Sequence, residues 1–532
     1  MPRPATTKAF ALACCLALLR LSAHGQQPSL TANAQEVAGR YEGVAHSRTS
    51  GDIPVTAEIR VATGGAVTGV MQTPLGDLSI TNVSYAGGTL KFRIESYDDD
   101  GTVTARFADG KITGEFEGFG QSGTIELRRT GPAGPVPDTR PVLNLGPEAW
   151  REDLRFLARE LPRKHKNAFH LTTRAEFERA VAELDARIPS LSDSERVVHL
   201  SRIVAMIGDG HTALGWRWLY PRVPLELFWF GSELRVTRAA KTHRRALGAK
   251  LVKVGGAPIA DVYARSLPFI PRGESEGFVR STHADLVTHP VFLHALGLAP
   301  DNARARYTFE DERGRTFTLD LGAEAASRPA EWLDAAARTP LYREQPDAPL
   351  WFEHLPDART LYVNFKGYPR RREFAEVSKK LFDFLDRNPV ERVVFDLRQN
   401  GGGDLTRGRD FVIKQVKERP SVNRRGRLYV VIGRWTYSAG MANAADFRND
   451  TNAILVGEPT GARPNGYQEG RGFMLPNSRL PVNYSIEFYK FQEKDTPGII
   501  PDKRIDPDWP SYKRGRDPVM EWILNQKVSS KQ

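Results

Sequence analysis

Short runs in which apolar and polar residues alternate fill the first quarter of the chain. Segments 55–61 and 89–94 are two of these runs, and glycine-rich turns separate them. Alternation with a period of two predicts strands that bury one face, and glycine suits the turns between them. We therefore expect residues 30–130 to form an antiparallel β-domain, a barrel or a sandwich, that is an accessory domain without chemistry of its own.

A stretch rich in glycine and proline follows and breaks every periodic pattern, so we interpret residues 131–144 as a linker. Helical periodicity then marks residues 145–221. Helices are predicted over 177–188 and 192–207, and Ser192 with Glu195 forms a candidate capping box at the start of the second. An earlier helix carries four apolar residues on one face, Trp150, Leu154, Leu157 and Leu161.

Strand patterns return in residues 222–300. Within them, segment 247–259 resembles the central strand and turn of a PDZ domain. The carboxylate-binding loop that opens such a domain is not evident, so binding of peptide tails does not follow from this resemblance.

After about Asp357, strand and helix patterns alternate, which favours a parallel-rich α/β core. We place this core within residues 301–512, ahead of a C-terminal tail at 513–532. Strands are predicted at 360–365, 392–397, 428–433 and 453–457, and helices at 374–385, 405–417 and 439–447.

The first 25 residues have the pattern of a cleaved secretory signal. Arg3 and Lys8 precede an apolar run over 9–19, and small residues follow it. This run is shorter than the roughly 20 residues that span a membrane, so we expect no stable membrane insertion after cleavage. Residues 1–25 therefore predict a periplasmic or secreted protein.

The cysteine positions and the charge distribution argue against two classes of function, thiol chemistry and nucleic-acid binding. Both cysteines, Cys14 and Cys15, lie within the predicted signal, so the mature chain would have neither disulfides nor thiol chemistry. A lipoprotein signal ending at Cys14 is an alternative. The formal charge is +11, but no cluster of basic and aromatic residues indicates nucleic-acid binding.

Two strand–turn–helix units carry the candidate chemistry. In the first, a buried strand runs into Gly401, Gly402 and Gly403. In the second, Ser438 stands between a strand and a helix that begins with Ala439. Amides at helix N-termini lack intrahelical partners, so Gly402 or Gly403 together with Ala439 are candidates for an oxyanion hole. Ser438 is then the candidate nucleophile, and a simple helix cap is the alternative.

Together with segment 456–461, these units resemble the core of the S41 serine peptidases, the tail-specific, C-terminal-processing and tricorn-type proteases. The resemblance covers about 145–509 and implies a ClpP/crotonase-like α/β spiral core. Members of the C-terminal-processing branch use a lysine as base. Here Arg463 stands nearest that place, and arginine does not release its proton near neutral pH.

The tricorn-like branch uses histidine instead, and His211 matches it in position and type. An imidazole suits general-base work at neutral pH. Gly210 stands where tricorn-type sites have a serine, so the group that orients the histidine is open. We prefer Glu469 as the supporting carboxylate, with Glu487 and Asp209 as alternatives.

These observations predict a secreted or periplasmic serine endopeptidase that cleaves peptides or proteins without a metal or other cofactor. His165 and His170 lie among lysines without a partner ligand set, and we expect them to be solvated. One alternative is a non-catalytic ligand-binding protein on the same scaffold. Another is an interaction module whose β-domain docks a cell-surface polymer.

Overall fold

The computed structural model describes residues 34–61, 66–74, 76–96, 100–119, 121–134, 140–325 and 331–527. The predicted signal and both cysteines lie outside these ranges. The chain divides into two compact units. One consists mainly of Arg140–Tyr368 and Val377–Gln532, and the other of Ala17–Thr139 with Pro369–Glu376.

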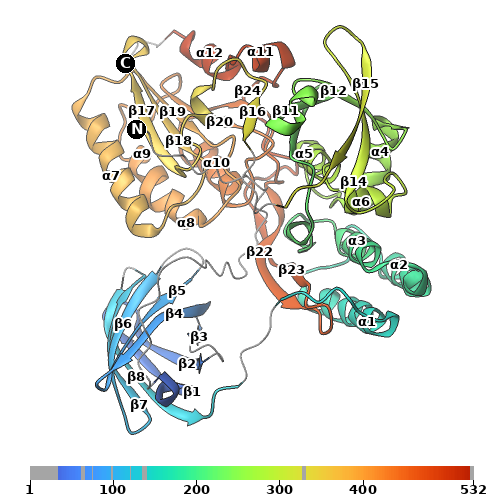
Figure 1. The fold of residues 1–532 in the computed structure, drawn as a ribbon. Helices are drawn as coiled ribbons and strands as arrows, with labels where there is room; N and C mark the ends of the chain where they lie inside the picture. The colour runs from blue at the N-terminus through green and yellow to red at the C-terminus, as the bar shows by residue number, and fades with distance from the viewer. Residues whose placement is uncertain are drawn as a thin grey trace, which may run out of the picture. The chain divides into compact units, whose positions relative to one another are not determined.

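The smaller unit contains a closed antiparallel barrel of eight strands (Figure 1). Each strand pairs with the next, and the last pairs with the first. Alternate side chains fill the interior, among them Tyr41, Ile59 and Phe92, so the predicted antiparallel β-domain is confirmed in the form of a barrel. Its strands are β1 (Gly39–Ser47), β2 (Gly51–Val61), β3 (Val67–Thr73), β4 (Gly76–Ala86), β5 (Thr89–Glu95), β6 (Asp100–Ala108), β7 (Lys111–Gly118) and β8 (Gln121–Gly131).

The larger unit begins with three helices, α1 (Pro147–Lys164), α2 (Arg174–Arg187) and α3 (Asp193–Ala205). The capping box expected at Ser192 and Glu195 is present at the start of α3. The four apolar residues predicted to share a face of α1 are fully buried. Burial of this face fixes α1 within the unit, because apolar area removed from water is the main stabilising term in folding.

An antiparallel sheet of seven strands follows, with three short helices, α4 (Ile259–Ser266), α5 (Glu276–Leu286) and α6 (Pro290–Ala295). Segment 247–259, for which a PDZ-like strand and turn were predicted, contains β12 (Lys250–Val254) and β13 (Ala257–Pro258). The sheet consists of β12 (Lys250–Val254), β13 (Ala257–Pro258), β10 (Leu225–Phe230), β11 (Glu233–Ala240), β14 (Arg304–Glu310), β15 (Thr316–Gly322) and β16 (Trp332–Asp334).

A six-stranded sheet forms the centre of the α/β core, in the order β17-β18-β19-β20-β21-β24. All neighbours after β18 pair in parallel, whereas β17 (Leu350–Leu355) is antiparallel to β18. The predicted alternation of strands and helices is therefore confirmed. The other elements are β18 (Thr360–Phe365), β19 (Arg392–Asp396), β20 (Leu428–Ile432), β21 (Ile454–Gly457), β24 (Lys503–Arg504), α7 (Arg371–Arg387), α8 (Leu405–Gly408), a π-helical turn (Arg409–Ile413), α9 (Lys414–Lys417), α10 (Ala439–Asp450), α11 (Trp509–Lys513) and α12 (Pro518–Leu524).

A three-stranded sheet connects the helical segment to this core. It consists of β22 (Asn465–Met474), β23 (Pro481–Lys490) and β9 (Ala213–Leu214) (Figure 1). The short strand β9 follows α3 and pairs with β23 through Leu214 and Val482. The turn between α3 and β9 is thereby held within the larger unit. Within the described ranges, every helix lacks the length or the apolar composition needed to cross a bilayer.

Candidate active site

Ser438 stands at the carboxyl end of β20, in a turn that its neighbours hold in place. The backbone has φ 50° and ψ −125° at this residue, a conformation that costs free energy for any residue with a side chain. The amide of Tyr437 donates to the carbonyl of Asn400 at 2.9 Å, and the Thr436 hydroxyl donates to the carbonyl of Leu397 at 2.7 Å. These bonds connect the turn to the loop after the neighbouring strand β19.

The imidazole of His211 meets the hydroxyl of Ser438. Nε2 lies 3.0 Å from Oγ, and the histidine comes from the turn between α3 and β9, where it is buried. Ser438 makes no side-chain bond that caps α10. The geometry thus supports the nucleophile over the helix cap, because the hydroxyl faces a base instead of the helix amides.

Tyr437 contacts the imidazole of His211 at its second nitrogen and along its ring. Its Oη lies 3.4 Å from His211 Nδ1, and the two rings are stacked with centroids 5.0 Å apart. Phe278 stacks against the tyrosine in turn, at 5.3 Å. Burial lowers the pKa of His211 below its ordinary value, although the carboxylate of Asp209 acts in the opposite direction. The imidazole is therefore neutral, and able to accept a proton, at pH 7.

Glu274, just before α5, was not expected at the site. Its Oε1 accepts from the Gly210 amide at 2.8 Å and from the Tyr437 hydroxyl at 3.0 Å. Its Oε2 accepts from the Arg463 amide at 3.4 Å. Burial, assisted by the charge of Asp209, raises the pKa of this carboxyl to about 7, even though these hydrogen bonds favour the charged form.

Asp209 is buried beside the site, but both its oxygens are engaged elsewhere. Oδ2 lies 2.9 Å from Nε2 of His165, and Oδ1 accepts from the Ser485 hydroxyl at 2.6 Å. The Asn167 amide donates to His165 Nδ1, so the ring proton of that histidine is on Nε2 and points to Asp209. Burial raises the pKa of Asp209, but His165 and Ser485 outweigh it and the net shift is downward. Asp209 thus acts on His211 only through its charge.

The expectation that His165 is solvated is wrong, because its side chain is fully buried against Asp209. His170 is partly buried and stacks on His165, with ring centroids 6.1 Å apart. Across the described ranges, no three or more histidine, cysteine, aspartate or glutamate side chains gather in a way that could hold a metal ion.

The structure does not bring Glu469 to the histidine, which corrects the preferred assignment of the supporting carboxylate. Glu469 lies on β22, is exposed, and accepts from the Tyr489 hydroxyl at 2.9 Å. Glu487 is also exposed, and pairs with Lys166 at 3.3 Å. Of the three carboxylates considered from the sequence, only Asp209 is near His211.

The glycine loop lies against the nucleophile. A Cβ on Gly402 would stand 2.6 Å from Ser438 Cβ, and the positive φ of 115° also favours glycine here. The Gly402 amide itself donates to Asn400 Oδ1 at 3.0 Å, so it is not available to an oxyanion. For the amides of Gly403 and Ala439, the described residues supply no acceptor, and these two are the remaining candidate donors.

The guanidinium of Arg463 is bonded to residues other than the Ser438–His211 pair. It donates to the Gly273 carbonyl at 3.3 Å and to Asp495 at 2.9 Å. The side chain therefore anchors a loop, and only its backbone amide contacts a site residue, Glu274.

Two site residues escaped the sequence analysis. Tyr437 directly precedes the candidate nucleophile, and this adjacency was the signal that could have singled it out. Glu274 lies 64 residues from Gly210, whose amide it binds, and no local pattern distinguishes it from other acidic residues before helices.

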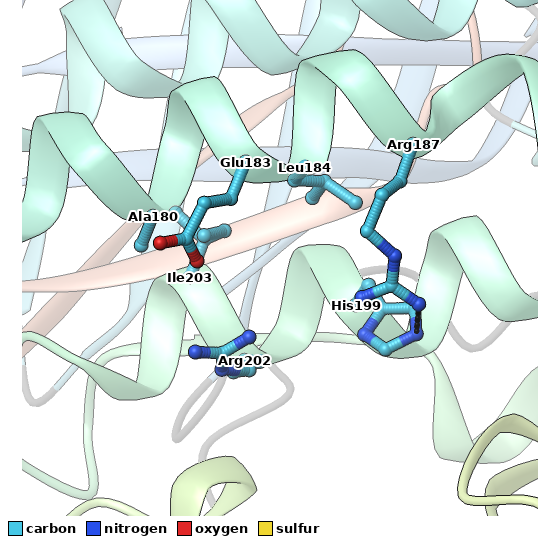
Figure 2. Close-up of a pocket in the computed structure, with 7 residues that line it drawn as sticks. All are labelled: Ala180, Glu183, Leu184, Arg187, His199, Arg202 and Ile203. Carbon is cyan, nitrogen blue, oxygen red and sulfur yellow. Dashed lines mark hydrogen bonds between the residues drawn. The ribbon is translucent and has the colours of Figure 1, made fainter.

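A pocket between α2 and α3 is separate from this site (Figure 2). Arg187 donates to Nε2 of His199 at 3.2 Å, and the two arginines of the pocket help burial to lower the pKa of His199 to about 4. None of the site residues described above lines this pocket, which is formed by Ala180, Glu183, Leu184, Arg187, His199, Arg202 and Ile203.

Comparison with known proteins gives a family match for residues 359–509, which fit the model of peptidase family S41. A mutant form of CPAF is similar with a TM-score of 0.50 and 10% identity, over 72% of this chain and 99% of that chain, which supports the fold alone. The photosystem II D1 C-terminal processing protease has a TM-score of 0.34 and 16% identity over 72% and 99% of the chains. The tricorn protease has a TM-score of 0.35 and 14% identity, over 89% of this chain and 45% of that one.

A search among curated proteins found none that matches. The family match nevertheless confirms the resemblance drawn from the two strand–turn–helix units, since it includes both of them. Residues 359–509 of this chain thus match peptidase family S41, and the match supports a serine-type peptidase whose substrates are peptides or proteins.

Proposed function

We propose that the protein is a secreted or periplasmic serine endopeptidase in which Ser438 is the nucleophile and His211 the general base. The contact of 3.0 Å between His211 Nε2 and Ser438 Oγ carries the proposal. It is supported by the conformation of Ser438, whose strained backbone presents the hydroxyl to the histidine and not to α10. The neutral imidazole favoured by burial has the protonation state that a base needs.

The reaction follows from these positions. As Ser438 Oγ attacks the carbonyl carbon of the scissile bond, its proton passes to His211 Nε2 and the carbonyl oxygen becomes an oxyanion. The amides of Gly403 and Ala439 are the donors we assign to that oxyanion. His211 then gives its proton to the leaving amine, the C–N bond breaks, and an acyl-serine remains. Water, deprotonated by His211, releases the acyl group and restores Ser438.

Three finer features belong to the same proposal. The S41 resemblance favours a ClpP/crotonase-like arrangement of the core and a PDZ-like role for the segment around β12 and β13. Residues 1–25 favour export through a cleaved signal. Intact-mass measurement of the exported protein tests the last point, because a mature chain that still contains Met1 would overturn it.

A fluorophosphonate probe tests the nucleophile. It is expected to label the protein once, at Ser438, as located by peptide mapping. Ser438→Ala should remain folded by circular dichroism while losing both the label and the cleavage of a quenched-fluorescent casein. Ser421→Ala, which changes an exposed serine, serves as the matched control and should behave like the wild type. A Ser438→Ala variant that still cleaves casein would overturn the assignment.

The base is tested by two variants. His211→Ala should lose at least about 10²-fold in kcat, the lower range for removal of a positioned base. Arg463→Ala should keep kcat within a few-fold, because its guanidinium contacts Gly273 and Asp495 and its backbone amide is unchanged. If wild-type protein takes up no label and cleaves nothing, the ligand-binding alternative is favoured instead.

A further inference from the structure

A continuous line of polar contacts leads from the nucleophile to a mostly buried carboxyl group. Ser438 Oγ lies 3.0 Å from His211 Nε2, and His211 Nδ1 lies 3.4 Å from the Tyr437 hydroxyl. That hydroxyl lies 3.0 Å from Glu274. The Gly210 amide, directly before the histidine in sequence, fixes the same carboxyl oxygen at 2.8 Å. Glu274 therefore contacts two groups that neighbour His211, the Gly210 amide and the Tyr437 hydroxyl.

We propose that Glu274 acts through the hydroxyl of Tyr437 as the positioning carboxylate of His211, and that its ionisation selects the histidine tautomer that can accept the serine proton. This inference rests on the proposed function, in which Ser438 attacks and His211 is the base. It assigns to Glu274 and Tyr437 the orienting role that the sequence left open.

The polarity of the hydrogen bonds supplies the reason. Ionised Glu274 only accepts, so the Tyr437 proton points to it and the tyrosine oxygen accepts from His211 Nδ1–H. The imidazole then carries its proton on Nδ1 and presents a lone pair at Nε2 to Ser438. When Glu274 is protonated, its O–H donates to the tyrosine, whose proton turns toward Nδ1. The ring proton must then lie on Nε2, where it blocks proton transfer from the serine.

The other candidate carboxylates do not offer this path. Both oxygens of Asp209 are engaged with His165 and Ser485. Glu469 is exposed and bonded to Tyr489. Of these carboxylates and Glu274, only Glu274 contacts an atom, the Tyr437 hydroxyl oxygen, that in turn contacts the histidine ring.

The groups around Glu274 place the pKa of its carboxyl near neutral pH. From the turn after α3, the Asp209 charge disfavours a second negative charge, whereas the Gly210 amide favours the ionised form. From the turn before α10 it meets the Tyr437 hydroxyl, and from the loop after β21 the amide of Arg463, both of which favour the ionised form. The balance with burial raises the pKa of Glu274 to about 7, whereas that of His211 is lowered. Glu274, not the histidine, therefore sets the acid limb of activity.

The rate of fluorophosphonate labelling, measured between pH 5 and 9, tests this without knowledge of the natural substrate. In the wild type the rate should rise with a midpoint near 7. In Glu274→Gln, whose amide donates as a protonated carboxyl does, the plateau should fall about tenfold to 100-fold, and the midpoint should move below 6.5, to the pKa of His211 alone. Glu469→Gln is the matched control and should keep both the rate and the midpoint.

Tyr437→Phe controls for misfolding of the Glu274 variant, because it removes only one oxygen and keeps the ring stack with Phe278. It should reproduce the Glu274→Gln profile, and the double variant should lose no more than either single one, as expected for residues acting in one chain. A Glu274→Gln protein with the wild-type midpoint and rate would overturn the inference while leaving the proposed function intact. Failure of the wild type itself to label would instead refute the proposed function.

Discussion

The hydroxyl of Tyr437 occupies the space that a side chain on Gly210 would need. A Cβ atom at Gly210 would lie 2.2 Å from the tyrosine oxygen, far inside contact distance, and 2.9 Å from the ring of Phe278. Gly210, the glycine before the proposed base, is thus matched to Tyr437, the residue before the proposed nucleophile. Tyr437 therefore supplies a hydroxyl beside His211 from a distant segment of the chain.

Gly210→Ala should therefore disturb Tyr437 and lower kcat by about tenfold or more, since a displaced hydroxyl no longer holds His211 Nδ1. In a Tyr437→Phe background, the same substitution should cost clearly less, because the oxygen that it strikes is gone. Steady-state kinetics of the four proteins give this coupling. Gly466→Ala is the control, because its Cβ would meet nothing closer than 3.9 Å. Strictly additive losses would contradict the matched pair.

Gly440→Ala should damage the oxyanion loop. The new Cβ would stand 2.5 Å from the carbonyl oxygen of Asn400 and 2.6 Å from its Oδ1, the two atoms that hold Tyr437 and Gly402. We expect kcat to fall by about 10²-fold, the usual effect of losing one oxyanion donor, and stability to fall by about 1–3 kcal/mol. Casein cleavage and thermal unfolding measure the two effects. Gly470→Ala, where nothing lies within 4 Å, should leave both unchanged.

The raised pKa of Glu274 predicts a dependence of stability on pH. The unfolded chain ionises this residue near its ordinary value of 4.5, the folded chain only near 7. Between these values the folded protein binds the extra proton, so this carboxyl contributes a free energy of unfolding that is lost as pH rises through 7. Glu274→Gln removes the effect. The free energy of unfolding of the variant, taken relative to that of the wild type, should therefore rise by about 2–3 kcal/mol from pH 5 to pH 8. Urea unfolding at both values decides this, and a difference that is independent of pH would contradict it.

The α/β core and the place of the proposed nucleophile were predictable because each depends on short-range patterns. Alternating strand and helix periodicity implies parallel strands, whose carboxyl ends meet at one edge of the sheet. Ser438 and the glycine loop follow neighbouring strands, β20 and β19, so their proximity follows from the topology. His211 was found by residue type and family resemblance, not by periodicity.

The supporting carboxylate was not predictable, because it depends on packing between distant segments. Glu469 was preferred for its place after a glycine turn, but along β22 Gln468 is buried whereas Glu469 and the three residues after it are exposed. Glu274 reaches the site through the loop before α5, 163 residues before Tyr437 in sequence. His165 was misjudged for a similar reason, since its partner Asp209 lies 44 residues further along the chain.

His211 and Ser438 lie 227 positions apart in the sequence, so under the proposed function the reacting pair exists only in the folded chain. A chain that is still being synthesised has the histidine long before the serine exists. A chain that is complete but unfolded holds the two at random distances, and its serine is then as unreactive as any other. Under the proposed mechanism, cleavage by Ser438 begins only when the turn after α3 and the turn after β20 have come together.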